Sequence, residues 1–254
     1  MAATLSRTTR MPYGVTNAAP RQTLGNYGAP DPVWSAYVDL DYIQNGDTTA
    51  LSQNGGATVA LVAGLFGLAA VTTGAVANTL GASSTAQAVF QVPTTANGLS
   101  RMFFKWDGML DSLLATLQVG FVASAASSPQ GIYIQSAVTT GALSLIVKNG
   151  TGTTTVPLGQ SLVAGTPVEL GIEVDIMGNV FAYFEPGTGE PVTNTNGTLS
   201  NGPVAVAYNQ VNGALTGLFL PTSVLFASQG AIPTTAVARV MTVDFFVAAQ
   251  QRDE

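Results

Sequence analysis

Alternation of apolar and polar residues in short runs is the sequence feature that most constrains how this chain can fold. From Val33 onward these runs follow one another, with turn residues between them. Arg101–Trp106 places three large apolar side chains on one face and Lys105 on the other. A period of two is the period of a β-strand with one buried face. We therefore expect a half-buried strand here, with its cations in water.

Later runs repeat the pattern. Asn149-Gly150 follows one of them, and Asn-Gly between alternating runs is the strongest short hairpin signal. The further runs are Leu117–Ala123, Leu143–Val147, Val168–Ile176, Val180–Phe184 and Val240–Val247. Only Met109–Leu117 could form a helix, and it is short. Many short strands and almost no helix predict an all-β fold, an antiparallel two-sheet sandwich or barrel.

The first 32 residues differ from the rest of the chain. They contain four of the thirteen prolines, and residues 1–30 carry three arginines and no acidic residue, although the net charge of the chain is −6. Proline disfavours helix and keeps its neighbours extended. We expect residues 1–32 to form an extended basic arm and residues 33–254 one sandwich domain, with Gly187–Gly202 as a polar loop.

Composition excludes several classes of function. The chain has no cysteine and no histidine, so it has no disulfide, no thiolate nucleophile and no catalytic triad that uses histidine. Eight basic against fourteen acidic residues argue against binding of nucleic acid. Only 9% of the residues are charged. Because charges are costly to bury at contacts between subunits, this scarcity favours a protein that assembles, and we expect a homo-oligomer.

One uncharged segment raises the question of a membrane. No residue between Asp47 and Arg101 is charged, and Ala57–Leu80 is rich in Ala, Val and Leu. The run also contains threonines and glycines and has no basic residue close to either end to set an orientation. We expect buried strands there and no membrane span. The polar residues and Pro12 that follow Arg7 and Arg10 also predict that no secretory signal is present.

Four stretches of the chain resemble a known family in their order along the sequence. They are Val71–Gly74, Leu99–Trp106 followed by Leu117–Val122, Val168–Phe184, and Thr242–Phe246 followed by Gln251-Arg252. The chain resembles, over roughly residues 34–252, the concanavalin A-like, laminin-G-like modules of tailed-phage virion proteins. This resemblance implies a jelly-roll sandwich on a virion, commonly as a capsid decoration or cement protein.

The sharpest catalytic candidate is Glu173-Val174-Asp175, which resembles the start of the nucleophile strand of jelly-roll glycosidases. Retaining hydrolysis requires a second carboxylate about 5 Å from the first to protonate the leaving group. Met177 and Gly178 stand where that carboxylate would be needed. We therefore expect both carboxylates to lie on an outward strand face, and we predict no catalytic residue and no enzyme activity.

Other acidic residues could hold a metal or cap an element. Asp39-Leu40-Asp41, with Asn45 and Asp47, could supply oxygen ligands to calcium, but the spacing is not that of an EF-hand. We expect these residues to solvate a turn, and we predict no metal site and no cofactor. Asp107 could cap a short helix, and Asp111 has no visible partner.

Two glycosylation sequons and three aromatic residues remain. Asn149-Gly150-Thr151 and Asn196-Gly197-Thr198 are better interpreted as turns in a chain without an export signal. Phe103, Phe181 and Tyr183 occupy outward strand positions, where they could stack on sugars or pack beneath loops or subunits. Periodicity does not decide between these roles.

Our leading hypothesis is a capsid decoration or cement protein on the head surface of a phage virion, with the major capsid protein as its partner. The arm would lie along the shell, and its expected contact residues are Arg7, Arg10, Pro12, Tyr13, Arg21, Leu24 and Tyr27. The alternative hypothesis is a glycan-binding fibre or adhesin module. Neither hypothesis involves a membrane or nucleic acid.

Overall fold

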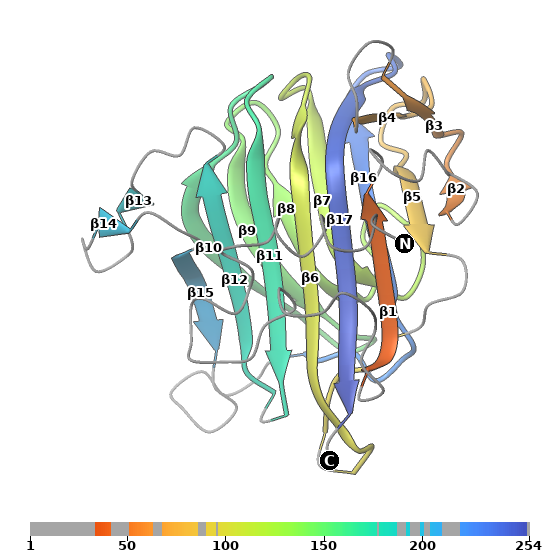
Figure 1. Cartoon of the computed structure of the whole chain (residues 1–254). Coiled ribbons are helices and arrows are strands. Elements are labelled where there is room, and N and C mark those ends of the chain that lie inside the picture. Colours follow the sequence, from red (N-terminus) through yellow and green to blue (C-terminus); the bar gives the residue numbers. More distant parts are fainter. Residues whose placement is uncertain are drawn as a thin grey trace, which may run out of the picture.

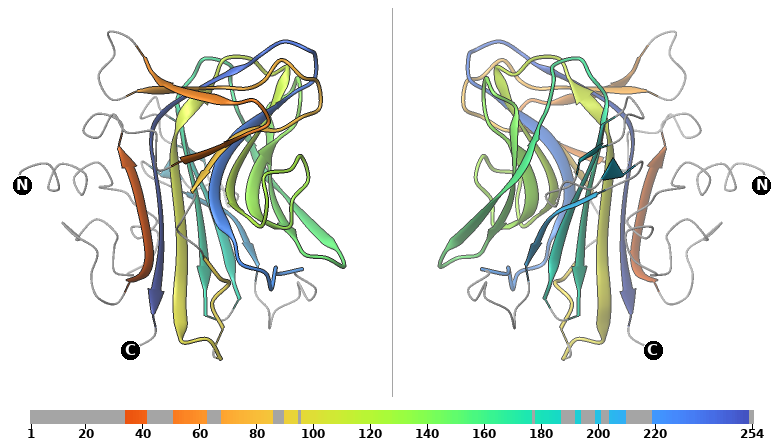
Figure 2. Two further views of the ribbon diagram at one scale, coloured as in Figure 1. Left: turned by 90° about the vertical axis from the view of Figure 1, so that its right-hand side faces the viewer. Right: turned by 90° about the vertical axis from the view of Figure 1, so that its left-hand side faces the viewer.

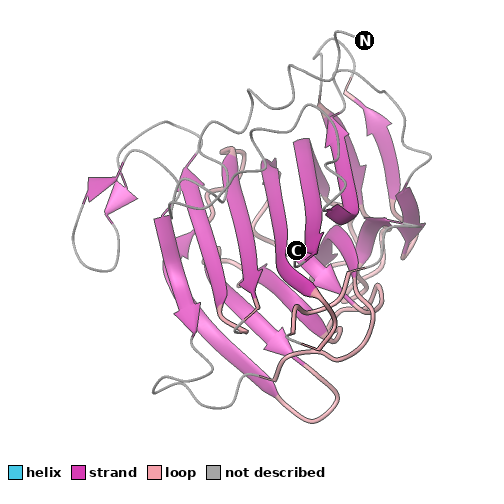
Figure 3. Ribbon diagram, turned by 60° about the horizontal axis from the view of Figure 1, so that its bottom comes forward, coloured by secondary structure: helices cyan, strands magenta, loops and turns pink. Residues whose placement is uncertain are grey.

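The chain folds as an antiparallel two-sheet β-sandwich, as the alternation predicted (Figure 1). The computed structural model describes residues 34–41, 51–62, 68–85, 90–94, 96–176, 178–186, 192–193, 199–200, 204–209 and 219–252. Within these ranges every regular element is a strand, and no helix is present (Figure 3). The predicted arm, residues 1–32, lies outside the described residues.

The larger sheet has eight strands, in the order β15-β12-β11-β6-β17-β4-β3, with β1 also paired to β17. Its long central strands are β6 and β17, which pair with each other along most of their length. The strands are β1 (Trp34–Asp41), β3 (Thr58–Leu61), β4 (Ala69–Thr72), β6 (Leu99–Leu110), β11 (Val168–Asp175), β12 (Val180–Pro186), β15 (Val204–Asn209) and β17 (Val240–Arg252).

The second sheet has seven strands, in the order β10-β9-β8-β7-β16-β5-β2. Figure 2 shows that this sheet is curved, with its hollow side turned away from the eight-stranded sheet. Its strands are β2 (Leu51–Asn54), β5 (Gly81–Thr85), β7 (Ala115–Val122), β8 (Gly131–Ser136), β9 (Ala142–Lys148), β10 (Thr153–Ser161) and β16 (Phe226–Pro233). A separate pair joins β13 (Val192–Thr193) and β14 (Leu199–Ser200) within the segment predicted as a polar loop.

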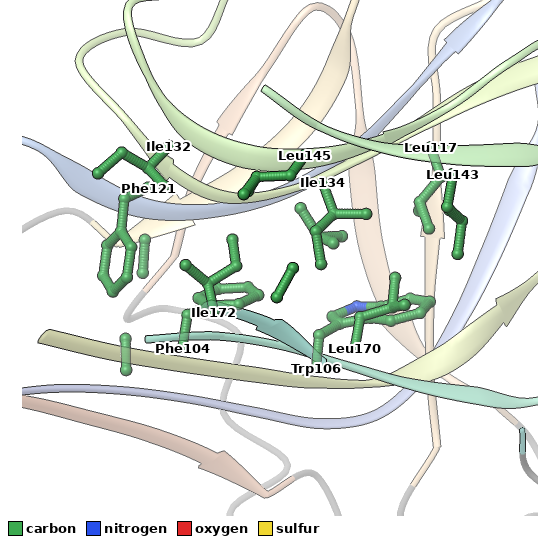
Figure 4. Packing of buried hydrophobic residues seen from close by; sticks show 14 of the residues in the cluster. Phe104, Trp106, Leu117, Phe121, Ile132, Ile134, Leu143, Leu145, Leu170 and Ile172 are labelled. Carbon is green, nitrogen blue, oxygen red and sulfur yellow. The ribbon is translucent and has the colours of Figure 1, made fainter. Parts of the chain in front are cut away.

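The hydrophobic core fills the space between the two sheets (Figure 4). Phe104 of β6 faces Phe121 of β7, and their rings meet edge to face with centroids 5.7 Å apart. Trp106 of β6 belongs to the same core, on the side of Leu117 and Leu143 (Figure 4). The predicted inward residues Ile172 and Val174 belong to the same core. Each fully buried large apolar side chain contributes about 1.5–3 kcal/mol. The faces assigned from alternation are therefore the faces that hold the sandwich together.

The segment Met109–Leu117, the one stretch whose sequence could have formed a short helix, does not form one. Strand β6 continues to Leu110, a turn occupies residues 111–114, and β7 begins at Ala115. The backbone of Met109 and Leu110 pairs with β17, and the hydrogen bonds of that ladder outweigh a weak local helix preference. Asp107 accordingly lies inside β6 and caps no helix.

The apolar segment Ala57–Leu80 contributes β3 and β4 to the sandwich. Ala69 and Val71 of β4 are buried in the core, as expected for strands rather than a membrane span. Among the described residues, no helix has the length and apolar character needed to cross a membrane.

Strand β17 departs from the predicted alternation. Met241 and Val243 face the core as expected, but the register shifts between Val243 and Phe245. After this bulge Ala248 points into the core, so the faces of the remaining residues are exchanged. A sequence pattern of period two does not reveal one inserted residue, which is why the predicted phase fails beyond Val243.

Candidate functional site

The outer face of the seven-stranded sheet carries a row of small and amide side chains across four strands. Gln118 of β7 lies opposite Gln135 of β8 and Gly230 of β16, and Gln135 lies opposite Ser144 of β9. Residues directly opposite one another in a sheet share a face. We call these four residues, Ser144, Gln135, Gln118 and Gly230, the polar row. It crosses the hollow side of the curved sheet.

Gln118 is the centre of the polar row. Its neighbours along the strand, Leu117 and Val119, point into the core, so its own side chain points to the outer face. The side chain is only 2% exposed, yet its amide nitrogen Nε2 has no hydrogen-bond partner among the described residues. A buried donor without a partner costs about 1–3 kcal/mol. Such a cost calls for an explanation: either an internal water supplies an acceptor, or the atoms that cover Nε2 move aside when a ligand with an acceptor binds.

Gly120, two residues after Gln118 on β7, is closely surrounded by neighbouring atoms. It lies in the next row of the same face, opposite Tyr133 of β8 and Ser228 of β16. Its φ of +143° is open to glycine, and a Cβ there would lie 2.6 Å from the carbonyl oxygen of Ile132. Any larger residue would push β7 and β8 apart. Glycine at position 120 therefore allows β7 and β8 to stay close enough to pair.

Residues 123–130, which connect β7 to β8, cross one end of this face, and we call them the strap. The Lys148 ammonium donates to the backbone oxygen of Ser128 at 3.0 Å and to its Oγ at 2.7 Å. Val122, Tyr133 and Ile146 form a small apolar cluster apart from the main core. Burial raises the pKa of the Tyr133 hydroxyl, and a hydrogen bond with Ser128 offsets part of the rise. The strap thus closes one end of the polar face.

The two sheets differ sharply in charge. Lys148 is the single charged residue in the seven strands of the curved sheet. The acidic residues of the described strands all belong to the eight-stranded sheet. The charge of Lys148 is already hydrogen-bonded to Ser128. The polar row itself carries hydroxyl and amide groups and no carboxylate. Such a surface can bind an uncharged polar ligand.

The carboxylates considered as catalytic candidates lie on the eight-stranded sheet. Glu173 faces away from the core, as predicted, but it is 0% exposed, and Tyr183 donates its hydroxyl to Glu173 Oε2 at 3.0 Å. Asp175 accepts hydrogen bonds from the backbone nitrogen and the Nδ2 of Asn179, at 2.9 and 2.7 Å. These contacts close the hairpin from β11 to β12. Both carboxylates therefore have structural partners.

The prediction that the cations of Arg101–Trp106 are in water is wrong for Lys105. Its side chain is almost fully buried, and its ammonium lies 2.6 Å from Glu169 Oε2 on the neighbouring strand. Phe103 and Tyr183 are buried on the same side of the sheet, and Phe181 is half-buried. Of the two roles that the sequence left open, the burial of Phe103 and Tyr183 favours packing and leaves neither ring exposed to stack on a sugar.

The remaining candidates have ordinary surroundings or lie outside the described residues. Asn149 Oδ1 accepts from the backbone nitrogens of Thr151 and Gly152, so the predicted turn is confirmed. Asp39 and Asp41 lie on β1, and Asn45, Asp47 and the second sequon are not described. Within the described ranges no cluster of three or more acidic, His or Cys residues could hold a metal. All seven predicted shell-contact residues of the arm lie outside the described ranges.

Sequence reasoning missed the polar row. It examined carboxylates and aromatic residues, whereas the row consists of glutamine, serine and glycine. The usable signal was the alternation itself, because Gln118 stands between two inward-pointing apolar residues. That pattern gives the face but not the burial of the amide. Only the pairing of β7 with β8 and β16, together with that of β8 with β9, brings the four residues together.

Comparisons with known proteins bear on the fold. No protein-family model matches this sequence, and a search of curated proteins found no match. Similar solved structures include SO2946, a protein of unknown function from Shewanella oneidensis MR-1, at 12% identity and a TM-score of 0.56, covering 89% of this chain and 91% of that one. The fold is concanavalin A-like.

Two further structures carry the same fold. The winged bean acidic lectin complexed with methyl-α-D-galactose is 10% identical, with a TM-score of 0.53, over 86% of this chain and 100% of the lectin. The endo-β-1,4-glucuronan lyase from the fungus Trichoderma reesei is 13% identical, with a TM-score of 0.52, over 86% of this chain and 95% of the lyase. The predicted concanavalin A-like jelly-roll is thereby confirmed.

Proposed function

We propose that this chain is a glycan-binding module and that the outer face of its seven-stranded sheet binds an uncharged glycan. The observation that carries the proposal is Nε2 of Gln118, at the centre of the polar row, which is buried and has no hydrogen-bond partner among the described residues. The atoms that cover Nε2 in the free chain would have to move aside, after which a sugar hydroxyl or an acetamido carbonyl would supply the missing acceptor. The half-buried Gln135 and Ser144 lie beside it on the same face, where they can contact neighbouring hydroxyls.

Charge and fold support the same proposal. The seven described strands of this sheet carry no carboxylate and one already bonded cation, which suits neutral sugars better than uronates or sulfated sugars. The winged bean lectin, which shares the fold, was solved with a galactoside. Identity of 10% carries no residue-level correspondence, so the proposal rests on the residues of this chain. Fold alone does not define function.

The prediction of a capsid decoration protein on a virion head stays a prediction. It rested on the sequence resemblance and on an arm whose residues are not described. The alternative prediction, a glycan-binding module, is the one that the lectin-like fold favours. We also propose that the module binds without turnover, because Glu173 is buried and hydrogen-bonded to Tyr183 while Asp175 closes a turn.

The proposal can be tested with a glycan array and one isosteric substitution. Gln118→Met keeps the length of the side chain but removes the amide. We expect the wild type to bind uncharged oligosaccharides and not uronate or sulfated ones. The variant should bind at least about tenfold more weakly, the effect of losing one hydrogen bond of about 1.4 kcal/mol. Gln53→Met, an exposed glutamine of β2, is the matched control and should bind normally.

Stability separates a binding role from a structural one. Because Gln118 Nε2 is buried without a partner, Gln118→Met should leave the free energy of unfolding unchanged or raise it by up to about 1–3 kcal/mol. A variant that is as stable as the wild type and yet loses glycan binding supports the proposal. Unchanged binding by Gln118→Met, or binding confined to acidic glycans, would overturn it.

A further inference from the structure

Five connecting segments meet at the end of the sandwich where β6 passes into β7 and β16 into β17, the upper end in Figure 1. We call this end the upper pole. Its segments are residues 73–80, 111–114, 137–141, 162–167 and 234–239. They come from both sheets, since the antiparallel pairing returns the chain to this end repeatedly.

Backbone hydrogen bonds tie these segments to one another. Thr234 donates to the oxygen of Leu114, Thr139 to that of Leu113, and Asn78 to that of Pro233, at 2.7 to 3.0 Å. The two non-glycine residues with positive φ among the described residues, Asn78 (58°) and Thr139 (64°), are both here. A β-branched residue in that conformation is strained, and such strain gathers at functional sites. The loops of the upper pole are therefore held to one another by backbone hydrogen bonds.

Exposed aliphatic side chains gather on the upper pole. Of the five large hydrophobic residues that are exposed in the described part of the chain, four belong to these segments. They are Val76, Leu114, Val163 and Val237, which are between 44% and 61% exposed. The fifth, Val224, precedes β16 and lies at the opposite end. Grouped apolar side chains on a rigid surface mark a contact with another protein.

The upper pole carries one charge of each sign, which bears on the partner that it could contact. Its described segments contain one acidic residue, the exposed Asp111, and one basic residue, Arg239. The backbone N–H of Asp111 donates a hydrogen bond to the backbone oxygen of Val240, the residue after Arg239. Among the described residues, however, neither Asp111 nor Arg239 forms an ion pair. One charge of each sign, on an otherwise uncharged surface of aliphatic and threonine side chains, can pair with its opposite on a second copy. A two-fold contact pairs each charge with its opposite.

We propose that the upper pole is the contact surface for a second copy of this chain. The aliphatic side chains of four loops would pack on their counterparts, and Asp111 of each copy would meet Arg239 of the other. The contact lies at an end of the strands, so it leaves the outer face of both seven-stranded sheets free. A dimer of this kind would present two polar rows. The inference stands independently of the ligand proposed for them.

Sedimentation equilibrium of the full chain over a wide concentration range tests the proposal. We expect a monomer–dimer equilibrium in the wild type. Val163→Glu and Val237→Glu should each weaken the dimer at least about 100-fold, because each places an unpaired carboxylate in the contact. Val224→Glu introduces the same charge at the opposite end and should leave the dimer unchanged. Since these residues are exposed, all three variants should keep the wild-type thermal stability.

Reversal of the two charges provides the sharper test. Asp111→Arg and Arg239→Asp should each weaken the dimer about tenfold, whereas the double variant restores the pairing and should recover most of the wild-type affinity. A wild type that stays monomeric at every concentration would overturn the proposal. So would a dimer that Val163→Glu and Val237→Glu leave intact, or a double variant weaker than both single ones.

Discussion

Glutamine has different roles at different positions of this sandwich, and its surroundings decide which. Gln229 lies in the core with no exposure, and its Oε1 accepts from Trp106 Nε1 at 2.9 Å, which links β16 of one sheet to β6 of the other. Gln250 exchanges hydrogen bonds with the backbone of Gln91 and fixes residues 90–94 against β17. Gln118 is also buried, but its amide nitrogen is not satisfied. That contrast separates the candidate ligand-binding residue from its structural counterparts.

The link between Trp106 and Gln229 leads to a prediction about stability. Gln229→Leu removes the acceptor and leaves the buried indole N–H without it, so the free energy of unfolding should fall by about 1–3 kcal/mol. Urea denaturation measures the change, and Gln53→Leu, an exposed glutamine at the sheet edge, is the control. A loss below about 0.5 kcal/mol would show that the link does not hold the sheets together.

At the scale of elements, the strap lies over Tyr133 of β8, and the ionisation of this residue leads to a prediction about stability. The pKa of Tyr133 is raised above its usual 10.0, so the folded protein holds this proton more tightly than the unfolded chain. The contribution of Tyr133 to stability is complete below about pH 10 and is lost as the pH rises above that value.

Tyr133→Phe tests this pH dependence. The variant loses the hydrogen bond with Ser128 at every pH, a constant cost of about 1 kcal/mol. Its free energy of unfolding should then fall less steeply than that of the wild type between about pH 10 and pH 12. Chemical denaturation of both proteins across this range measures the two slopes. Parallel slopes would mean that Tyr133 titrates alike in the folded and unfolded states.

Elements were also where prediction from sequence succeeded best. The alternation of Met102, Phe104 and Trp106 assigned the core face of β6 correctly, because the period of a strand is written in consecutive residues. It failed for Lys105, since alternation tells which face a side chain takes but not whether that face is buried. The bulge after Val243 was equally invisible. The polar row could not be predicted, because it depends on the pairing of strands far apart in sequence.

At the scale of the whole molecule, the two sheets of the sandwich differ in charge and in the side chains that they present. The eight-stranded sheet holds the acidic strand residues, including the buried Glu173 and the pair of Lys105 with Glu169. The seven-stranded sheet is curved (Figure 2). It is nearly without charge, and its outer face carries the amides and the hydroxyl of the polar row. The upper pole lies at one end of both sheets. Binding of a glycan and pairing of copies can therefore occur on separate surfaces.

The most direct test of the glycan-binding proposal observes Gln118 itself. The side-chain amide signal of Gln118, assigned by its disappearance in Gln118→Met, can be followed by nuclear magnetic resonance during titration with the strongest uncharged oligosaccharide from the array. The account predicts that this signal shifts in a saturable way, at the same midpoint as Gln135, while the signal of Gln53 stays fixed. A Gln118 signal that does not move while the glycan binds would contradict it, as would the absence of any binding.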